Sequence, residues 1–506
     1  MSINLFGRVI EDNDQTRARR EHLERIQALV GNAYPNKFSR TSLTGSAEGE
    51  DTITSVVRAF EKHAPELKEG ERPTPEQLEA ANAELSRYVV RVSGRLATPP
   101  RVMGTAAFVN LSDGRARLQI YVRRQEAVAI SNDSDQSVEE TESGWKLFQL
   151  LDHGDFIGVE GAVFITKTGE LSVHVSTIQF LSKALQPMPD KLHGINDPEI
   201  RQRQRYADLI ASSLKVETGD EPQTEGTERE LSTREVFVRR SKLITAMRRH
   251  LDEHGYIEVE TPMLSPIASG AAARPFKTHH NALDIDLYLR IAPELYLKRL
   301  LVGGFERVYE LNRNFRNEGI SARHNPEFTM LEFYTAYKDV NWMMDFCEEM
   351  LRETVQAVHG SLQLQFDGEV IDFSWVERLS MKEAIIRHQS PAWSMLDSEY
   401  FEGDWIEDPR FVRQLILLDD IIRLNIAASV SDETEQSITL QTSISELWKR
   451  AQTEDSMLDE PEEAEAAHRI AQLFELTAEK LLNQPTFITD FPKVISPLSK
   501  ASPDDS

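Results

Sequence analysis

Residues 305–337, "FERVYELNRNFRNEGISARHNPEFTMLEFYTAY", constrain the fold more than any other stretch, because two apolar runs flank a turn signal at "NEG". In a strand, the period of two places Phe328, Met330, Glu332 and Tyr334 on one face. A carboxylate among apolar side chains is stable only with a cationic partner or a proton. The stretch therefore predicts an antiparallel hairpin that buries charge, and it leaves open what that charge meets.

Two further charged positions sharpen the question. Arg316 directly follows the first predicted strand, where its planar guanidinium can bind phosphate oxygens; a surface ion pair with Glu318 is the alternative. Glu294 is a second carboxylate within an apolar stretch, "IAPELYLKRL". Two carboxylates and a tyrosine hydroxyl suit a compact ammonium group, whereas pairing of Glu332 with an internal arginine is the structural alternative.

Charge and hydropathy narrow the class of protein. The net charge of −26 argues against a polyanionic partner, but much of the acidic excess lies in separate tracts that begin at Val216, Ser429 and Thr453. Outside them, surfaces that meet nucleic acid remain possible. The beginning of the chain has no apolar secretory core, and no run of about 18 uncharged apolar residues occurs, which predicts a cytoplasmic protein without membrane spans. The single cysteine, Cys347, excludes an internal disulfide.

The region from Tyr88 to about residue 186 is rich in short β-type runs with turn signals. About five strands in a hundred residues suggest a small closed barrel, of which the five-stranded oligonucleotide-binding (OB) barrel is one candidate. A helix is expected at 16–29, with a basic face that includes Arg17, Arg19, Arg20 and Arg25 and is either solvated or lies on a nucleic-acid backbone. A surface insertion is expected at 42–84.

After the barrel the pattern becomes mixed α/β. "REVFVRRSKLITAMRRHLDEHG" predicts an amphipathic helix that ends near Gly255, and "YIEVETPML" predicts a strand that stops at Pro262. These segments, "SGAAARPF" and the hairpin closely resemble the first two signature motifs of the class II aminoacyl-tRNA synthetases, and in detail the lysyl-tRNA synthetases.

The resemblance implies an α+β fold, with an OB-fold barrel that binds the tRNA anticodon and an antiparallel catalytic sheet flanked by helices. It implies activation of L-lysine by ATP to lysyl-adenylate, transfer of the lysyl group to tRNA(Lys), and a homodimer formed through the first motif. The corresponding domains are an N-terminal helix with an acidic insertion (1–86), the barrel (87–186), a linker with a second insertion (187–235) and the catalytic domain (236–506).

Residue by residue, the resemblance assigns Arg316 to the α-phosphate of ATP as the catalytic arginine. The remaining expected ATP contacts are Glu318, His324, Asn325 and Phe328. The expected lysine contacts are Gly270, Glu294, Glu332 and Tyr334. The expected anticodon contacts are Phe108, Gln119 and Glu170, with Arg101 as a candidate backbone contact. For Phe108 by itself, a place in the core is the simpler interpretation.

The family's third motif, which carries a second phosphate-binding arginine, has no match in residues 1–506, and neither have its acidic Mg²⁺ ligands. Mg²⁺ is therefore expected from the resemblance without nameable ligands, and the catalytic sheet is expected to be incomplete. A truncated or frame-shifted product, a second polypeptide or loss of aminoacylation would explain this. Rival interpretations are a tRNA-binding or regulatory paralogue and an aspartyl- or asparaginyl-type synthetase.

Overall fold

The computed structural model describes residues 13–45, 49–65, 71–188, 198–214, 231–267, 273–321, 324–388, 463–496 and 498–500, together with 406, 412, 415 and 416. The chain forms two compact units, Met1–Phe237 and Val238–Ser506. Among the described residues, no helix has the length and apolar character that a membrane crossing requires.

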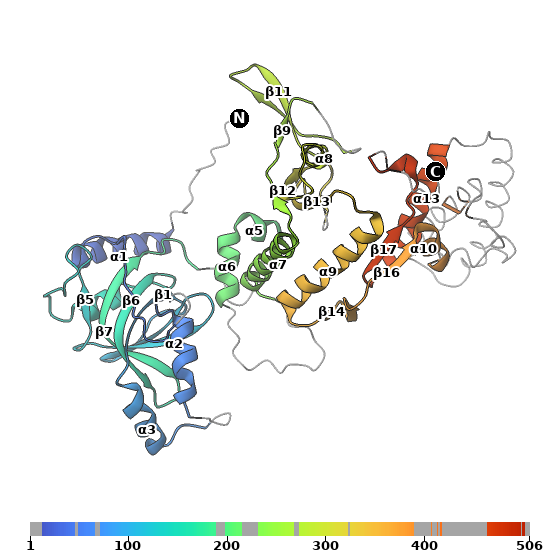
Figure 1. The fold of residues 1–506 in the computed structure, drawn as a ribbon. Helices are drawn as coiled ribbons and strands as arrows, with labels where there is room; N and C mark the ends of the chain where they lie inside the picture. Colours follow the sequence, from blue (N-terminus) through green and yellow to red (C-terminus); the bar gives the residue numbers. More distant parts are fainter. Residues whose placement is uncertain are drawn as a thin grey trace, which may run out of the picture. The chain divides into compact units, whose positions relative to one another are not determined.

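The first unit is built on a closed barrel (Figure 1). Neighbouring strands follow the order β1-β6-β7-β4-β3, and β3 pairs back onto β1 through Arg95↔Ser112 and Leu96↔Leu111. This closure confirms the predicted five-stranded OB barrel, to which β2 and β5 add short extra strands. The strands are β1 Val89–Leu96, β2 Arg101–Met103, β3 Ala106–Ser112, β4 Arg117–Arg123, β5 Val128–Ile130, β6 Phe156–Ile165 and β7 Leu171–Ser182.

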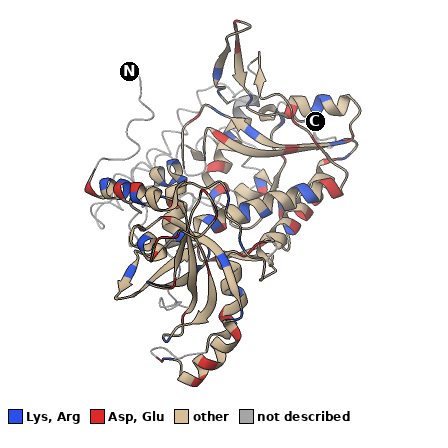
Figure 2. Cartoon of the chain, turned by 90° about the vertical axis from the view of Figure 1, so that its left-hand side faces the viewer, with Lys and Arg blue, Asp and Glu red and all other residues tan. Residues whose placement is uncertain are grey.

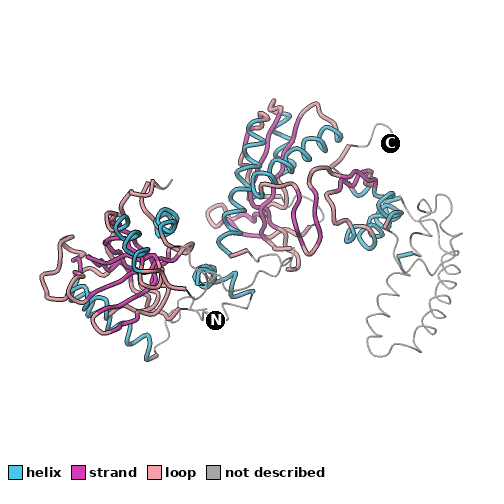
Figure 3. The backbone as a smooth tube through the Cα atoms, turned by 90° about the horizontal axis from the view of Figure 1, so that it is seen from below, coloured by secondary structure: helices cyan, strands magenta, loops and turns pink. Residues whose placement is uncertain are grey.

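Helices surround the barrel strands, as the tube view shows (Figure 3). They are α1 Asp14–Val30, α2 Ile53–Phe60, α3 Pro75–Leu85 and α4 Ser143–Gln149. Two further helices, α5 Pro198–Arg203 and α6 Arg205–Leu214, follow later in the chain. The expected surface insertion is wrong for α2, because Ile53, Val56 and Phe60 are buried in the same core as the barrel strands. Apolar residues on one face of this short helix seal the barrel instead of lying in solvent.

Helix α1 begins with a capping box at Asn13 and covers the predicted helix at 16–29. One member of its expected basic face is not exposed: Arg19 is buried, and its guanidinium donates to the carbonyl oxygens of His153 and Ala184. Basic and acidic residues both lie along α1 (Figure 2), and several of each are exposed. The helix therefore contributes to the packing of the barrel as well as to its surface.

The second unit contains the predicted hairpin. Strands β12 Arg307–Phe315 and β13 Glu327–Thr335 pair antiparallel, and the register sets Glu310 directly opposite Glu332. Strand β8, Ile257–Glu258, joins β12 in parallel. The strand predicted to stop at Pro262 is shorter than expected, because β8 ends at Glu258 and Thr261 turns to bind Glu310. Pro262 has no N–H for a ladder, and a separate strand, β9 Leu264–Ser265, follows it.

Two helices cover one face of the hairpin. Leu251 near the end of α7, Thr233–Glu253, and Phe346 of α9, Val340–His359, share a buried cluster with Tyr309. Leu331 and Phe333 pack against that cluster, so alternation directs Glu332 and Tyr334 to the opposite face. Helix α8, Glu294–Val302, lies against β12 and β13 as well. As predicted, α7 stops just before Gly255, whose positive φ of 75° suits glycine.

The remaining described elements form small sheets and helices. Strands β9, β11 and β10 form one sheet, β14 pairs with β15, and β16 pairs in parallel with β17. These elements are β10 Lys277–His280, β11 Ile285–Leu289, β14 Gln363–Phe366, β15 Glu369–Asp372, β16 Glu377–Ser380, α10 Met381–Arg387, α13 Glu463–Thr477 and β17 Thr486–Thr489. The mixed α+β class is confirmed. The acidic tract from Ser429 and most of the tracts from Val216 and Thr453 fall outside the described residues, while the end of the Thr453 tract forms the first turn of α13.

Candidate functional site

Arg316 lies where β12 ends, and its backbone N–H donates to the carbonyl of Pro326 at 2.9 Å. Its guanidinium carbon is 5.3 Å from the centre of the Phe328 ring, and its Nε is buried without a hydrogen-bond partner. In the described part of the chain no ion pair joins Arg316 to Glu318, which removes the surface-pair alternative. A planar cation with an unused buried donor is suited to an incoming anion.

The other expected ATP contacts follow Arg316 around the turn. His324 is exposed, and its Nδ1 lies 2.8 Å from the hydroxyl of Ser321. Asn325 is exposed and its amide donates to the carbonyl of Glu327 at 2.8 Å. The structure thus places Arg316 against Phe328, and it leaves His324 and Asn325 in contacts local to the turn.

Glu332 is half-buried beside Tyr334, whose hydroxyl donates to Glu332 Oε2 at 3.1 Å. Burial raises the pKa of the Glu332 carboxyl, and the nearby carboxylates of Glu294 and Glu310 raise it further. Burial and the same Glu332 charge raise the pKa of the Tyr334 phenol. Glu294 forms a partly exposed ion pair with Lys298 at 2.7 Å. Negative charge therefore accumulates at this face of the hairpin.

A buried ion pair explains why the nearby arginine does not neutralise the Glu332 carboxylate. Arg290 Nη1 lies 2.7 Å from Glu310 Oε1, with side-chain exposures of 3% and 1%. The hydroxyl of Thr261 adds a hydrogen bond of 2.6 Å to Glu310 Oε2. The internal arginine therefore pairs with Glu310, and no Lys, Arg or His nitrogen of the described residues lies within 4.0 Å of the Glu332 carboxylate. Arg290 and Glu310 were not predicted, although Glu310 lies within the predicted first strand.

Gly270, the remaining expected lysine contact, lies outside the described residues. The other three expected lysine contacts come from two elements. Glu294 is the first residue of α8, while Glu332 and Tyr334 are neighbours on one face of β13.

The three expected anticodon contacts also meet on one face, on the outside of the barrel. Gln119 of β4 donates to Glu170 Oε2 at 2.6 Å, and its own Oε1 accepts from Ser172 at 3.0 Å. Burial raises the pKa of the Glu170 carboxyl, against the opposing effect of the Gln119 hydrogen bond. Phe108 is half-buried on β3, and Arg101 of β2 is its register partner.

Aromatic rings extend this face beyond the predicted residues. The ring of Tyr121 lies 4.8 Å from Phe108 and 5.9 Å from Phe164, and His174 lies 5.2 Å from Tyr121. A cavity of about 580 Å³ opens over them, lined by Arg101, Met103, Phe108, Gln119, Tyr121, Phe164, Thr166, Lys167 and Thr168. Strand alternation from Phe108 and Gln119 would have found Tyr121, which is two residues beyond Gln119.

A metal site brings several ligand atoms close together. Among the described residues, the one group of three or more His, Cys, Asp or Glu ligand atoms within 4.8 Å of one another is His250, His254 and Glu349. It includes none of the expected site residues, and Mg²⁺ prefers oxygen ligands. This one group of described residues therefore does not suit Mg²⁺.

Comparison with known proteins decides the family. Residues 226–506 match the family described as tRNA synthetases class II (D, K and N), and residues 90–181 match the OB-fold nucleic acid binding domain. A lysine–tRNA ligase of Aeromonas hydrophila is 40% identical over 494 residues, which cover 96% of this chain and 77% of the relative. The chain belongs to the lysine–tRNA ligase family. That membership confirms the resemblance seen in the sequence.

Other members of the lysine–tRNA ligase family are equally similar. The relative from Coxiella burnetii is 39% identical over 501 residues, covering 99% of this chain and 80% of the relative. The relative from Yersinia enterocolitica is 40% identical over 497 residues, covering 98% and 78%. The class II synthetase match includes the hairpin, and the OB-fold match includes Phe108, Gln119 and Glu170.

Proposed function

We propose that this chain is a lysine–tRNA ligase that activates L-lysine with ATP and transfers the lysyl group to tRNA(Lys). The observation that carries the proposal is Glu332. Its carboxylate is half-buried, lacks a basic partner among the described residues, and faces Glu310, which Arg290 already neutralises.

Lysine supplies the missing cation. An ammonium group has three donors and no acceptor, so it needs several oxygen atoms around it. Glu332 and the Tyr334 hydroxyl provide such oxygens, and Glu294 provides a third once Lys298 shares its carboxylate. Binding converts an unfavourable accumulation of negative charge into charge-assisted hydrogen bonds. Gly270 is proposed as the backbone contact with lysine.

The α-carboxylate of lysine is the nucleophile in the first step. It attacks the α-phosphate of ATP, a new C–O–P linkage forms, and pyrophosphate leaves. Arg316 stabilises the negative charge that develops on the transferred phosphate, while Phe328 stacks on the adenine ring. Glu318, His324 and Asn325 are proposed to contact the nucleotide. The protein works through positioning and charge, without a covalent enzyme intermediate.

In the second step a terminal ribose hydroxyl of tRNA attacks the lysyl carbonyl and AMP leaves. The barrel binds the anticodon of the same tRNA. We propose that Phe108 stacks on a base while Gln119 and Glu170 read base edges, because unpaired bases offer both a π-face and hydrogen-bonding edges. The Gln119–Glu170 hydrogen bond fixes both side chains on one face.

A homodimer is part of the proposal. Val238 and Leu243 on α7 are 42% and 38% exposed, which supports contact with a second copy through the first motif. Mg²⁺ and a cytoplasmic location stay predictions of the sequence.

Exchange of labelled pyrophosphate into ATP by the purified chain tests the proposal. We expect exchange that depends on lysine. Glu332→Gln should reduce this exchange, and Glu327→Gln should not. Glu327 is a suitable control because it lies on the same strand in an exposed pair with Arg313. Exchange driven by aspartate or asparagine would contradict the substrate. Binding of tRNA(Lys) without exchange would contradict the proposed catalysis and support a tRNA-binding paralogue.

A further inference from the structure

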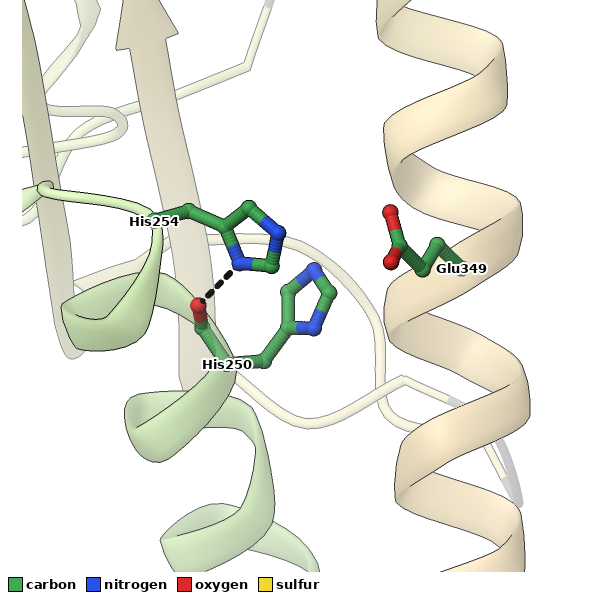
Figure 4. A group of neighbouring side chains, drawn as sticks. All are labelled: His250, His254 and Glu349. Carbon is green, nitrogen blue, oxygen red and sulfur yellow. Dashed lines mark hydrogen bonds between the residues drawn. The ribbon is translucent and has the colours of Figure 1, made fainter.

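Helix α7, the turn that follows it and helix α9 bring two imidazoles and a carboxylate together away from the hairpin site. Ligand atoms of His250, His254 and Glu349 all lie within 4.8 Å of one another. In Figure 4 the two imidazole rings and the carboxylate point into one shared space between the helices. His250 is 1% exposed, whereas Glu349 is exposed, so the space is closed at one end and open at the other.

The hydrogen bonds of the two rings fix which nitrogens are available. His254 Nδ1 lies 2.7 Å from the backbone carbonyl of His250, which only accepts, so this nitrogen carries the proton. His250 Nδ1 lies 2.7 Å from a carboxylate oxygen of Glu353 and donates to it in the same way. In neutral imidazoles both Nε2 atoms therefore present lone pairs.

The two Nε2 atoms and the Glu349 carboxylate are all acceptors, so none of them can donate a hydrogen bond to another. His250 Nε2 is buried and has no hydrogen-bond partner, a state that is unfavourable for a polar atom. A cation placed between these three groups satisfies all of them. The carboxylate behind His250 is the arrangement that orients metal-binding histidines and increases their basicity.

We propose that His250, His254 and Glu349 bind one Zn²⁺ ion, with a fourth position open to water. Zn²⁺ accepts imidazole nitrogen and carboxylate oxygen together in tetrahedral sites. Glu349 and Glu353 together balance its two charges. The rival occupant of the same space is a proton, which would make one histidine an imidazolium that donates to Glu349.

The site serves structure and not hydrolysis. The two histidines have the i, i+4 spacing of zinc-binding helices, but the position after the first histidine is Leu251, where a hydrolytic site carries glutamate. Leu251 is fully buried with Phe346, whose ring lies 4.9 Å from His250. The ion would tie α7 to α9 behind the hairpin, on the face opposite to Glu332.

Zinc binding by the metal-free full chain tests this inference. Equilibrium dialysis against Zn²⁺ and the visible spectrum of a Co²⁺-loaded sample give stoichiometry and coordination. One ion per chain with a tetrahedral Co²⁺ spectrum is expected. His254→Gln and Glu349→Gln should abolish that spectrum, and Glu353→Gln should weaken Zn²⁺ binding ~10–100-fold by releasing His250. His359→Gln, a histidine of α9 outside the group, should bind as the wild type does.

Separate readouts keep a folding defect from being read as a lost ligand. Glu349 is exposed, so Glu349→Gln should keep the wild-type circular dichroism spectrum and its lysine affinity. Zn²⁺ should raise the melting temperature of the wild type and not that of Glu349→Gln. The site would be overturned if the wild type did not bind Zn²⁺, or if Glu349→Gln and His254→Gln bound Zn²⁺ as tightly as the wild type does. A proton would then be the occupant of the space.

Discussion

The barrel face and the hairpin face both place a glutamate beside hydrogen-bonding neighbours, but they are supported differently. Phe108, Gln119 and Glu170 stand on the outside of a barrel that closes on itself around an apolar core. Glu332 stands in a three-stranded sheet, opposite a glutamate that is almost completely buried with Arg290.

This difference in support determines whether a substitution at each face changes ligand binding, stability or both. Side chains on the outside of the barrel can be exchanged without opening its core. On the hairpin, Glu332, which is proposed to bind lysine, lies directly opposite Glu310, whose ion pair with Arg290 holds the sheet. The two glutamates share one face, but only Glu310 has a basic partner among the described residues. Substitutions on the barrel face should therefore change affinity alone, whereas substitutions on the hairpin should divide into structural and binding effects.

The largest expected effect comes from breaking the buried pair. Glu310→Gln leaves the Arg290 guanidinium buried without its carboxylate, and removing one partner of such a pair costs ~3–5 kcal/mol. Hydrogen exchange followed by mass spectrometry should show loss of protection in β12 and β13. The barrel strands of the same molecule serve as the internal control. Unchanged protection of β12 would contradict a structural role for Glu310.

The second prediction concerns the carboxylate across the register. Glu332→Gln should weaken lysine binding by ~1.5–3 kcal/mol, the range for hydrogen bonds to charged groups, while the fold is retained. Protection of β13 should equal or exceed that of the wild type, because substitution removes a charge that burial and Glu294 disfavour. If Glu332→Gln loses hydrogen-exchange protection in the hairpin as Glu310→Gln does, then Glu332 also has a structural role. That result would contradict the assignment of stability to Glu310 and lysine binding to Glu332.

On the barrel, Phe108→Ala should weaken binding of the tRNA(Lys) anticodon stem-loop by ~1–3 kcal/mol, the usual contribution of a stacked base. The melting transition of the barrel should stay near that of the wild type, because Phe108 lies on its outer face. Tyr34→Ala, at an exposed tyrosine away from this cavity, is the aromatic control. A lower melting temperature of the barrel in Phe108→Ala would indicate instead that Phe108 is a core residue.

The smallest effect is a pH dependence at Glu332. Its pKa is raised in the folded state, so the native chain holds this proton more tightly than the unfolded chain does. As the pH rises from the unfolded to the folded pKa, ionisation of Glu332 lowers stability. Over the same interval lysine affinity rises, because the ammonium requires the carboxylate. Calorimetry in buffers of different ionisation enthalpy should detect proton release on lysine binding, which Glu332→Gln should lack.

Local patterns predicted the elements that depend on local chemistry. Alternation gave the hairpin and placed Glu332 and Tyr334 on one face, helical spacing located α1, and Gly255 marked the end of α7. Arg290 directly follows β11 and Glu310 lies on β12, a strand of a different sheet, so no periodicity indicates that they pair. The closing contact of β1 with β3 is equally non-local.

Long-range packing also explains the errors and omissions. Ile53 and Val56 belong to a short helix in a polar region, and only the barrel core reveals their role. The spacing of His250 and His254 is visible in the sequence, but Glu349 lies on another helix, and their proximity follows from the packing of Leu251 against Phe346. Arg19 looks like a surface charge until the carbonyls of His153 and Ala184 meet it.

The most direct measurement of the central claim is calorimetric titration of the full chain with L-lysine and with L-norleucine, which has the same carbon chain without the terminal ammonium. Wild-type protein should bind lysine and discriminate against norleucine, and Glu332→Gln should lose most of that discrimination. Glu327→Gln should behave as the wild type. Equal binding of the two amino acids by the wild type, or full discrimination by Glu332→Gln, would contradict an ammonium site at Glu332.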